Sequence, residues 1–188
     1  MDKQYSVLED GVRDLFIRAV WSHKTQEKQA ELYMKRYILM KTVEIICASL
    51  TSVGIISTIF SDYLFLRIFS AVLSLGAVFF AAFFKAFDLQ TMAKANKEAA
   101  CDLLIVRNKA MCLLTSIKLQ SKDVTEIEQL YSELMKEANE VYRRAPQTTA
   151  EALQRANDAL KIQGDNAFSV QDIDVNLPEA LKKGIKNE

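Results

Sequence analysis

Two long apolar runs occupy the centre of the chain, and charged residues lie before and after them. The first run covers residues 38–60 and the second covers residues 63–84, with only two residues between them. As helices they would be roughly 33–35 Å long, which matches a bilayer core about 30 Å thick. The remaining chain is too short to enclose two helices that are apolar on all sides. The pattern therefore predicts two transmembrane helices joined in a tight antiparallel hairpin.

Basic residues gather at the open end of this hairpin rather than at its tip. Arg67, one turn inside the second run, is the only basic residue near the tip. The basic residues around the open end are Lys24, Lys28, Lys35, Arg36, Lys41, Lys85, Lys94 and Lys97. Because lysine and arginine are enriched on the cytoplasmic side of membrane proteins, we expect both termini to be cytoplasmic.

The segments outside the spans have the apolar periodicity of helices. Residues 1–37 predict an amphipathic helix that continues into the first span. Residues 85–163 predict that the second span continues as a long rod, followed by a second helix that Asp123 caps and a short third helix that Thr148 and Glu151 begin as a capping box. The apolar positions expected to make bundle or oligomer contacts are Leu103, Leu113, Ile117, Ile127, Leu130, Leu134 and Val141. The predicted fold is an all-α membrane protein with a two-span hairpin, an N-terminal amphipathic helix and a C-terminal cytoplasmic helical bundle.

Residues 164–188 form a polar tail of a different character. Ile173, Val175 and Leu177 alternate with polar residues, which predicts a short strand-like segment, and Pro178 would then open a short basic helix. Two interpretations stay open: a solvated tail, or a docking peptide for a partner.

A line of small, hydroxyl and terminal charged residues follows the spans. Its members are Thr51, Thr58, Arg67, Ser70, Ser74, Ala77, Ala81 and Lys85. In lipid such residues mark close helix packing, but in an oligomer they would also suit the lining of a narrow water path. The charges at the ends would either anchor the helix at the interface or form rings at the two mouths of a pore.

Composition and motifs argue against several other functions. The 24 Lys and Arg residues balance the 24 Asp and Glu residues, so no basic nucleic-acid-binding domain is expected. There is no phosphate-binding loop, zinc-protease motif or nucleophile elbow, and a single histidine leaves few acid–base groups. Cys47, Cys101 and Cys112 lack metal-ligand spacing and are expected to be free, buried thiols. We therefore expect no enzyme activity, no catalytic residue, no cofactor and no metal site.

The run from Tyr142 to Thr149, YRRAPQTT, followed by a short Ala-rich helix, resembles the C-terminal signature of the SLATT domain. The order of elements over residues 6–163 resembles that family too. The resemblance implies a two-span effector of bacterial antiphage or conflict systems, located in the inner membrane. It also implies a sensor enzyme encoded nearby, either a nucleotide second-messenger synthase or a reverse transcriptase, and the chain is most similar to the reverse-transcriptase-associated branch.

The leading hypothesis for function is a gated pore in the lipid bilayer that depolarises the membrane and causes cell death or growth arrest. One hairpin encloses no lumen, so several copies would have to assemble as a homo-oligomer, most simply with cyclic symmetry. The alternative is a non-conducting membrane anchor or scaffold that recruits a partner enzyme to the bilayer.

Overall fold

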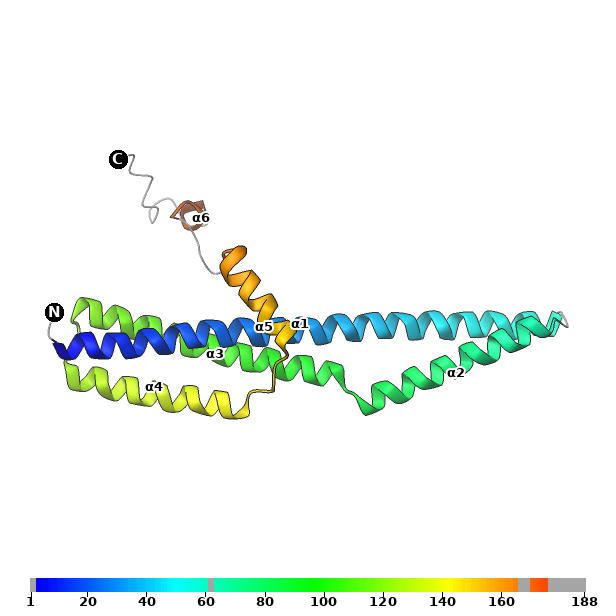
Figure 1. Cartoon of the computed structure of the whole chain (residues 1–188), viewed down its shortest axis with the longest axis horizontal. Helices are drawn as coiled ribbons and strands as arrows, with labels where there is room; N and C mark the ends of the chain where they lie inside the picture. The colour runs from blue at the N-terminus through cyan, green and yellow to red at the C-terminus, as the bar shows by residue number, and fades with distance from the viewer. Residues whose placement is uncertain (1–2, 61–62, 166–169, 176–188) are drawn as a thin grey trace.

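The computed structural model describes residues 3–60, 63–165 and 170–175. Every element in these residues is a helix, which confirms the predicted all-α class. The elements are α1 (Lys3–Phe60), α2 (Leu64–Ala86), α3 (Leu89–Leu119), α4 (Val124–Arg144), α5 (Ala150–Asn157), η1 (Asp158–Ile162) and α6 (Val170–Val175). In Figure 1, α1 runs along an elongated molecule, α2 returns beside α1 from the hairpin tip, and α3 and α4 lie along the opposite end.

The two apolar runs lie in α1 and α2, and their side chains face outward. Both helices are long and apolar enough to cross a membrane, and only 6% of the most apolar window in each is buried inside the chain. The core helix of a soluble protein would be mostly buried, so this surface needs lipid or another chain to cover it. Helix α1 passes from the extramembrane part into its apolar run without a break, as the sequence predicted.

The second span does not continue as an unbroken rod, and this part of the prediction is wrong. Helix α2 ends at Ala86, and the backbone of Phe87 leaves helical geometry. The Asp88 carboxylate then accepts hydrogen bonds from the backbone N–H of Thr91 at 3.0 Å and from its hydroxyl at 2.6 Å. These bonds lower the pKa of Asp88 below its usual value and begin α3 as a new helix. We call residues 87–88 the joint.

Helices α1, α3 and α4 form a three-helix bundle beyond the joint. Its core is aliphatic, because every third or fourth residue of each helix turns toward the other two. The buried members are Val12, Leu15, Ala19, Leu103, Val106, Ala110, Leu113, Ile117, Ile127, Leu134, Ala138 and Val141. Helix α4 begins at the predicted cap, since the Asp123 side chain accepts from the Glu126 N–H at 2.8 Å. It ends at Arg144, two residues before Pro146.

The third short helix begins one residue later than predicted. The cap is Thr149, whose hydroxyl accepts from the Ala152 N–H, and not Thr148. Glu151 forms ion pairs with Arg36 and Arg155. In Figure 1, α5 crosses α1 near the middle of the molecule.

The predicted strand-like segment near residue 173 is helical instead. Residues 170–175 form α6, and no strand lies in the described part of the chain. A strand must find its backbone hydrogen-bond partners on a neighbouring strand, whereas a helix supplies them within its own segment. The predicted basic helix after Pro178 lies outside the described residues.

Candidate functional site

The two spans meet where Gly54 of α1 faces Ser70 of α2. A Cβ atom built on Gly54 would overlap Ser70 Oγ and lie 3.2 Å from Ser70 Cβ. Ser70 is only 7% exposed, and its hydroxyl has no hydrogen-bond partner among the described residues. A small residue on each helix therefore lets the two backbones approach closely, as at many helix contacts in lipid.

Some members of the predicted line of small and polar residues on α2 lie in this contact, and others lie outside it. Ser70 is buried and Ala77 is half-buried against α1, whereas Ser74 and Ala81 are exposed. Ser74 is turned by about 40° from position 70, whereas Ala77 is turned by only about 20° in the opposite sense. Ala81 is also turned by only about 20°, but it lies near the end of α2, where Figure 1 shows this helix diverging from α1. Arg67 is also exposed, near the hairpin tip. The structure therefore places part of the line in the hairpin contact and leaves part outside it.

The remaining members of the line lie on α1 or at the far end of α2. Thr51 is half-buried, and its hydroxyl donates to the Cys47 carbonyl at 2.8 Å, so its polar atom is satisfied within its own helix. The side chains of Thr58 and Lys85 lie outside the described part of the chain.

Aromatic and charged side chains connect the spans at their open end. Tyr37 and Phe84 meet edge to face with ring centroids 5.8 Å apart. Lys41 Nζ lies 5.1 Å from the centroid of the Phe84 ring and pairs with Glu44 at 2.7 Å. Aromatic rings with a nearby lysine are typical of the membrane–water interface. This arrangement marks the level at which the hairpin leaves the bilayer.

The predicted bundle contacts lie inside a single copy of the chain. The buried ones are Leu103, Leu113, Ile117, Ile127, Leu134 and Val141, and Leu130 is partly buried against them. While the bundle stays folded, the buried residues cannot also make contacts between copies. Leu130 is only partly buried, and it lines an open groove together with Leu113 and Leu134.

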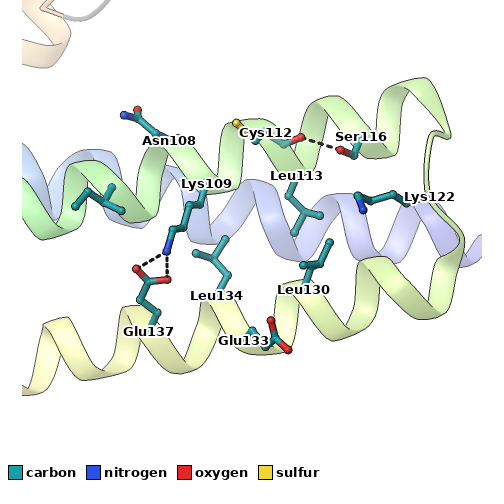
Figure 2. Close-up of a pocket in the computed structure, with 11 residues that line it drawn as sticks. Asn108, Lys109, Cys112, Leu113, Ser116, Lys122, Leu130, Glu133, Leu134 and Glu137 are labelled. Carbon is teal, nitrogen blue, oxygen red and sulfur yellow. Dashed lines mark hydrogen bonds and ion pairs between the residues drawn. The ribbon is translucent and has the colours of Figure 1, made fainter.

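That groove lies between α3 and α4 and has a volume of about 550 Å³. Figure 2 shows Leu113, Leu130 and Leu134 pointing into the space between the helices, and Lys109 reaching across to Glu137. The Lys109–Glu137 pair joins the helices at 2.6 Å. The groove is an apolar channel with a charged bridge, and a partner segment could lie along it.

A polar network on α1 near the membrane was missed by the sequence analysis. Lys24 is almost fully buried, and its Nζ pairs with Glu27 at 2.8 Å and with Asp165 at 3.1 Å. Lys97 of α3 also pairs with Glu27 at 3.3 Å. Burial alone would lower the pKa of Lys24, but the hydrogen bonds and charges of the two carboxylates outweigh it and raise that pKa. Conversely, burial would raise the pKa of Glu27, but its bonds to the two lysines lower it.

The cysteines are free but not all buried, which corrects the sequence-based expectation. Cys47 is half-buried, whereas Cys101 and Cys112 are exposed on α3. Cys112 lies at the rim of the groove between α3 and α4. Within the described residues, no group of three or more His, Cys, Asp or Glu side chains could hold a metal ion.

Comparison with known proteins finds one family. The family described as SMODS and SLOG-associating 2TM effector domain family 4 (SLATT_4) matches residues 8–172. No curated protein and no solved structure matches the chain significantly. The matched range extends from the bundle through both spans to α6.

Proposed function

The chain belongs to family 4 of the SMODS and SLOG-associating two-transmembrane effector domains, and is therefore a membrane effector of conflict systems; from this premise we propose that several copies form a gated pore. Opening of the pore would collapse the membrane potential and cause death or arrest of the cell. The membrane would be the bacterial inner membrane, with both termini in the cytoplasm. A sensor enzyme encoded nearby would supply the signal, and the association with a reverse transcriptase stays a prediction.

The observation that carries the proposal is the exposed edge of α2 on which the Ser74 hydroxyl and the small Ala81 lie. Ser74 and Ala81 lie within the span, yet the hairpin contact uses Ser70 and leaves them outside. A hydroxyl that faces lipid can bond only to a carbonyl of its own helix, as Thr51 does, whereas a neighbouring helix or a water path offers it further hydrogen-bond partners. Two helices enclose no lumen, so a ring of copies related by rotation is the simplest assembly that would use this edge.

Cysteine labelling tests the proposal directly. Ser74→Cys is introduced into a background of Cys47→Ala, Cys101→Ser and Cys112→Ser, and intact cells are treated with a charged, water-soluble thiol reagent. Leu75→Cys is the matched control, since Leu75 is 72% exposed but turned by about 100° from position 74. We expect labelling at position 74 only in cells that are losing their membrane potential, and none at position 75.

The anchor is the second candidate, and the groove between α3 and α4 favours it. An apolar groove of about 550 Å³ beside charged residues would suit a helix of a partner protein. A pure anchor would leave the membrane potential unchanged at any level of expression. Depolarisation measured with a potential-sensitive dye, at matched membrane insertion, therefore separates the two candidates.

A further inference from the structure

Residues 146–165 lie across α1 immediately before it enters its apolar run. The segment contains α5 and η1, and Figure 1 shows α5 crossing α1 between the bundle and the spans. Its contact with α1 covers residues 21–36, and the first predicted span begins at residue 38. We call residues 146–165 the strap.

Buried glutamines of α1 hold the beginning of the strap. Gln29 is fully buried, and its Oε1 accepts from both the backbone N–H and the hydroxyl of Thr149, each at 2.8 Å. Gln26 Nε2 donates to the Pro146 carbonyl at 2.9 Å. The Thr149 hydroxyl also accepts from the first turn of α5, so one side chain both caps this helix and fixes it on α1.

A buried charge holds the end of the strap. Gly164 adopts φ 69°, a left-handed conformation that glycine favours, and the Asp165 N–H donates to the Ala159 carbonyl at 2.9 Å. The turn brings the Asp165 carboxylate to Lys24 Nζ. When this contact opens, Lys24 still has Glu27, which stays within reach on the same helix. Release of Asp165 therefore does not leave Lys24 without an opposite charge.

The fully buried side chains in the middle of the strap are small, although Leu160 is half-buried and Glu151 pairs with Arg36 of α1. Ala152, Ala156 and Ala159 are buried, whereas Leu153 and Ile162 are exposed. Alanine buries much less apolar area than the leucine, isoleucine and valine residues of the bundle core. Docking also leaves Gln26 Oε1 and Gln29 Nε2 buried without a partner among the described residues, which reduces the net gain. The strap is therefore held mainly by polar contacts and is weakly attached compared with the bundle.

We propose that the strap is a detachable restraint: docked on residues 21–36 of α1, it holds the hairpin in its resting arrangement, and its release opens the pore. The proposal rests on the proposed function. Its mechanical basis is that α1 continues without a break from this contact into the membrane, so a change at residues 21–36 reaches the span through one rigid helix. A small docking energy is what a switch requires, because a signal needs only a modest differential affinity to reverse it.

The single tryptophan of the chain reports the state of the strap. Trp21 lies on α1, Lys161 Nζ of the strap lies 5.4 Å from its ring centroid, and Leu153 shares a pocket of about 360 Å³ with it. Release of the strap removes a cation and an apolar neighbour from the ring and admits water. Tryptophan emission in detergent or vesicles therefore measures docking independently of any conduction.

The test uses the full-length chain in two release variants. Asp165→Asn removes the ion pair with Lys24 at one end of the strap, and Thr149→Val removes the hydroxyl that donates to Gln29 and caps α5 at the other end. Losing each contact should shift the docking equilibrium about five- to tenfold toward release. Asp165→Glu keeps the charge and serves as the conservative variant. Asp102→Asn is the control, since it makes the same chemical change at an ion pair with Arg144 in the bundle, outside the strap and more exposed than the Lys24–Asp165 pair.

We expect red-shifted Trp21 emission and depolarisation at lower expression in the release variants, with wild-type behaviour in Asp165→Glu and Asp102→Asn. Unchanged emission would overturn the strap as the structure draws it. A red shift with unchanged or reduced depolarisation, in cells where the wild type does depolarise, would show that the strap is no restraint. If no variant depolarises although emission shifts, the proposed pore fails, and the restraint on it fails with it.

Discussion

The contact between Gly54 and Ser70 gives the sharpest test of the hairpin, because a second glycine provides the control. Gly54→Ala forces Ser70 Oγ to rotate away and still leaves two Cβ atoms 3.2 Å apart, closer than the usual carbon–carbon separation of about 3.5–4.0 Å. Gly76→Ala meets no atom within 4 Å. Both changes gain the same helix propensity, so the difference between them isolates the contact.

The expected change in melting temperature follows from the cost of overpacking and the gain in helix propensity. Overpacking costs about 1–3 kcal/mol, and replacing a helical glycine with alanine gains about 1 kcal/mol. For a chain of this length each kcal/mol corresponds to about 2–4 °C in melting temperature. We therefore expect Gly76→Ala to melt a few degrees above the wild type, and Gly54→Ala to melt about 2–12 °C below Gly76→Ala.

Melting can be followed in mild detergent through Cys47, which is half-buried about two turns before Gly54. With Cys101→Ser and Cys112→Ser in place, a thiol-reactive dye reports only the opening of the hairpin. Ser70→Ala should rescue Gly54→Ala in part, because it removes the overlapping oxygen but keeps the Cβ atom, and Ser70→Gly should rescue it fully, because it removes both atoms. The same melting temperature for both glycine variants, or no rescue, would refute the close approach of the spans at this position.

Three further predictions concern the polar network, the core and the topology. The contribution of Glu27 to the stability of the fold should be lost as pH falls below 4.5, because its pKa is lowered in the folded state. The contribution of Lys24 should be lost as pH rises above 10.5, because its pKa is raised. Trp21 emission should therefore stay constant between these two pH values. Ile127→Ala should destabilise the bundle by about 2–5 kcal/mol in thermal unfolding, and Leu130→Ala, at the groove edge, by clearly less. A reporter active only in the periplasm should be silent at either terminus and active when inserted before residue 63; an active C-terminal fusion would contradict the topology.

The parts of the fold predicted from the sequence are those whose chemistry is local. The cap at Asp123 and the end of α4 before Pro146 depend on residues only a few positions apart. The joint was missed because no glycine or proline marks it, and the Asp88–Thr91 cap resembles many polar pairs inside helices. Adjacent Thr148 and Thr149 have the same hydroxyl chemistry, so only the geometry could show which one caps α5.

The contacts of the candidate site could be predicted only in part. Small residues in both spans indicated close packing, but the pairing of Gly54 with Ser70 depends on the register of the two helices, which the sequence does not specify. Lys24 and Asp165 are 141 positions apart, and nothing in the pattern of either segment links them. Gln29 is fully buried, although an isolated glutamine in an amphipathic helix normally indicates a solvated position.

The two connections between bundle and membrane differ mechanically, and insertions can measure the difference. Helix α1 crosses the boundary unbroken, so one alanine inserted after Arg36 would turn the whole first span by about 100° against the bundle and destroy its contact with α2. One alanine inserted between Phe87 and Asp88 enters backbone that is already non-helical, with φ −124° and ψ 91° at Phe87, and the joint can absorb it. We expect the first insertion to lower the melting temperature and abolish depolarisation, and the second to preserve both. Equal damage from the two insertions would mean that the joint is as rigid as α1, and that movement of the bundle reaches both spans alike.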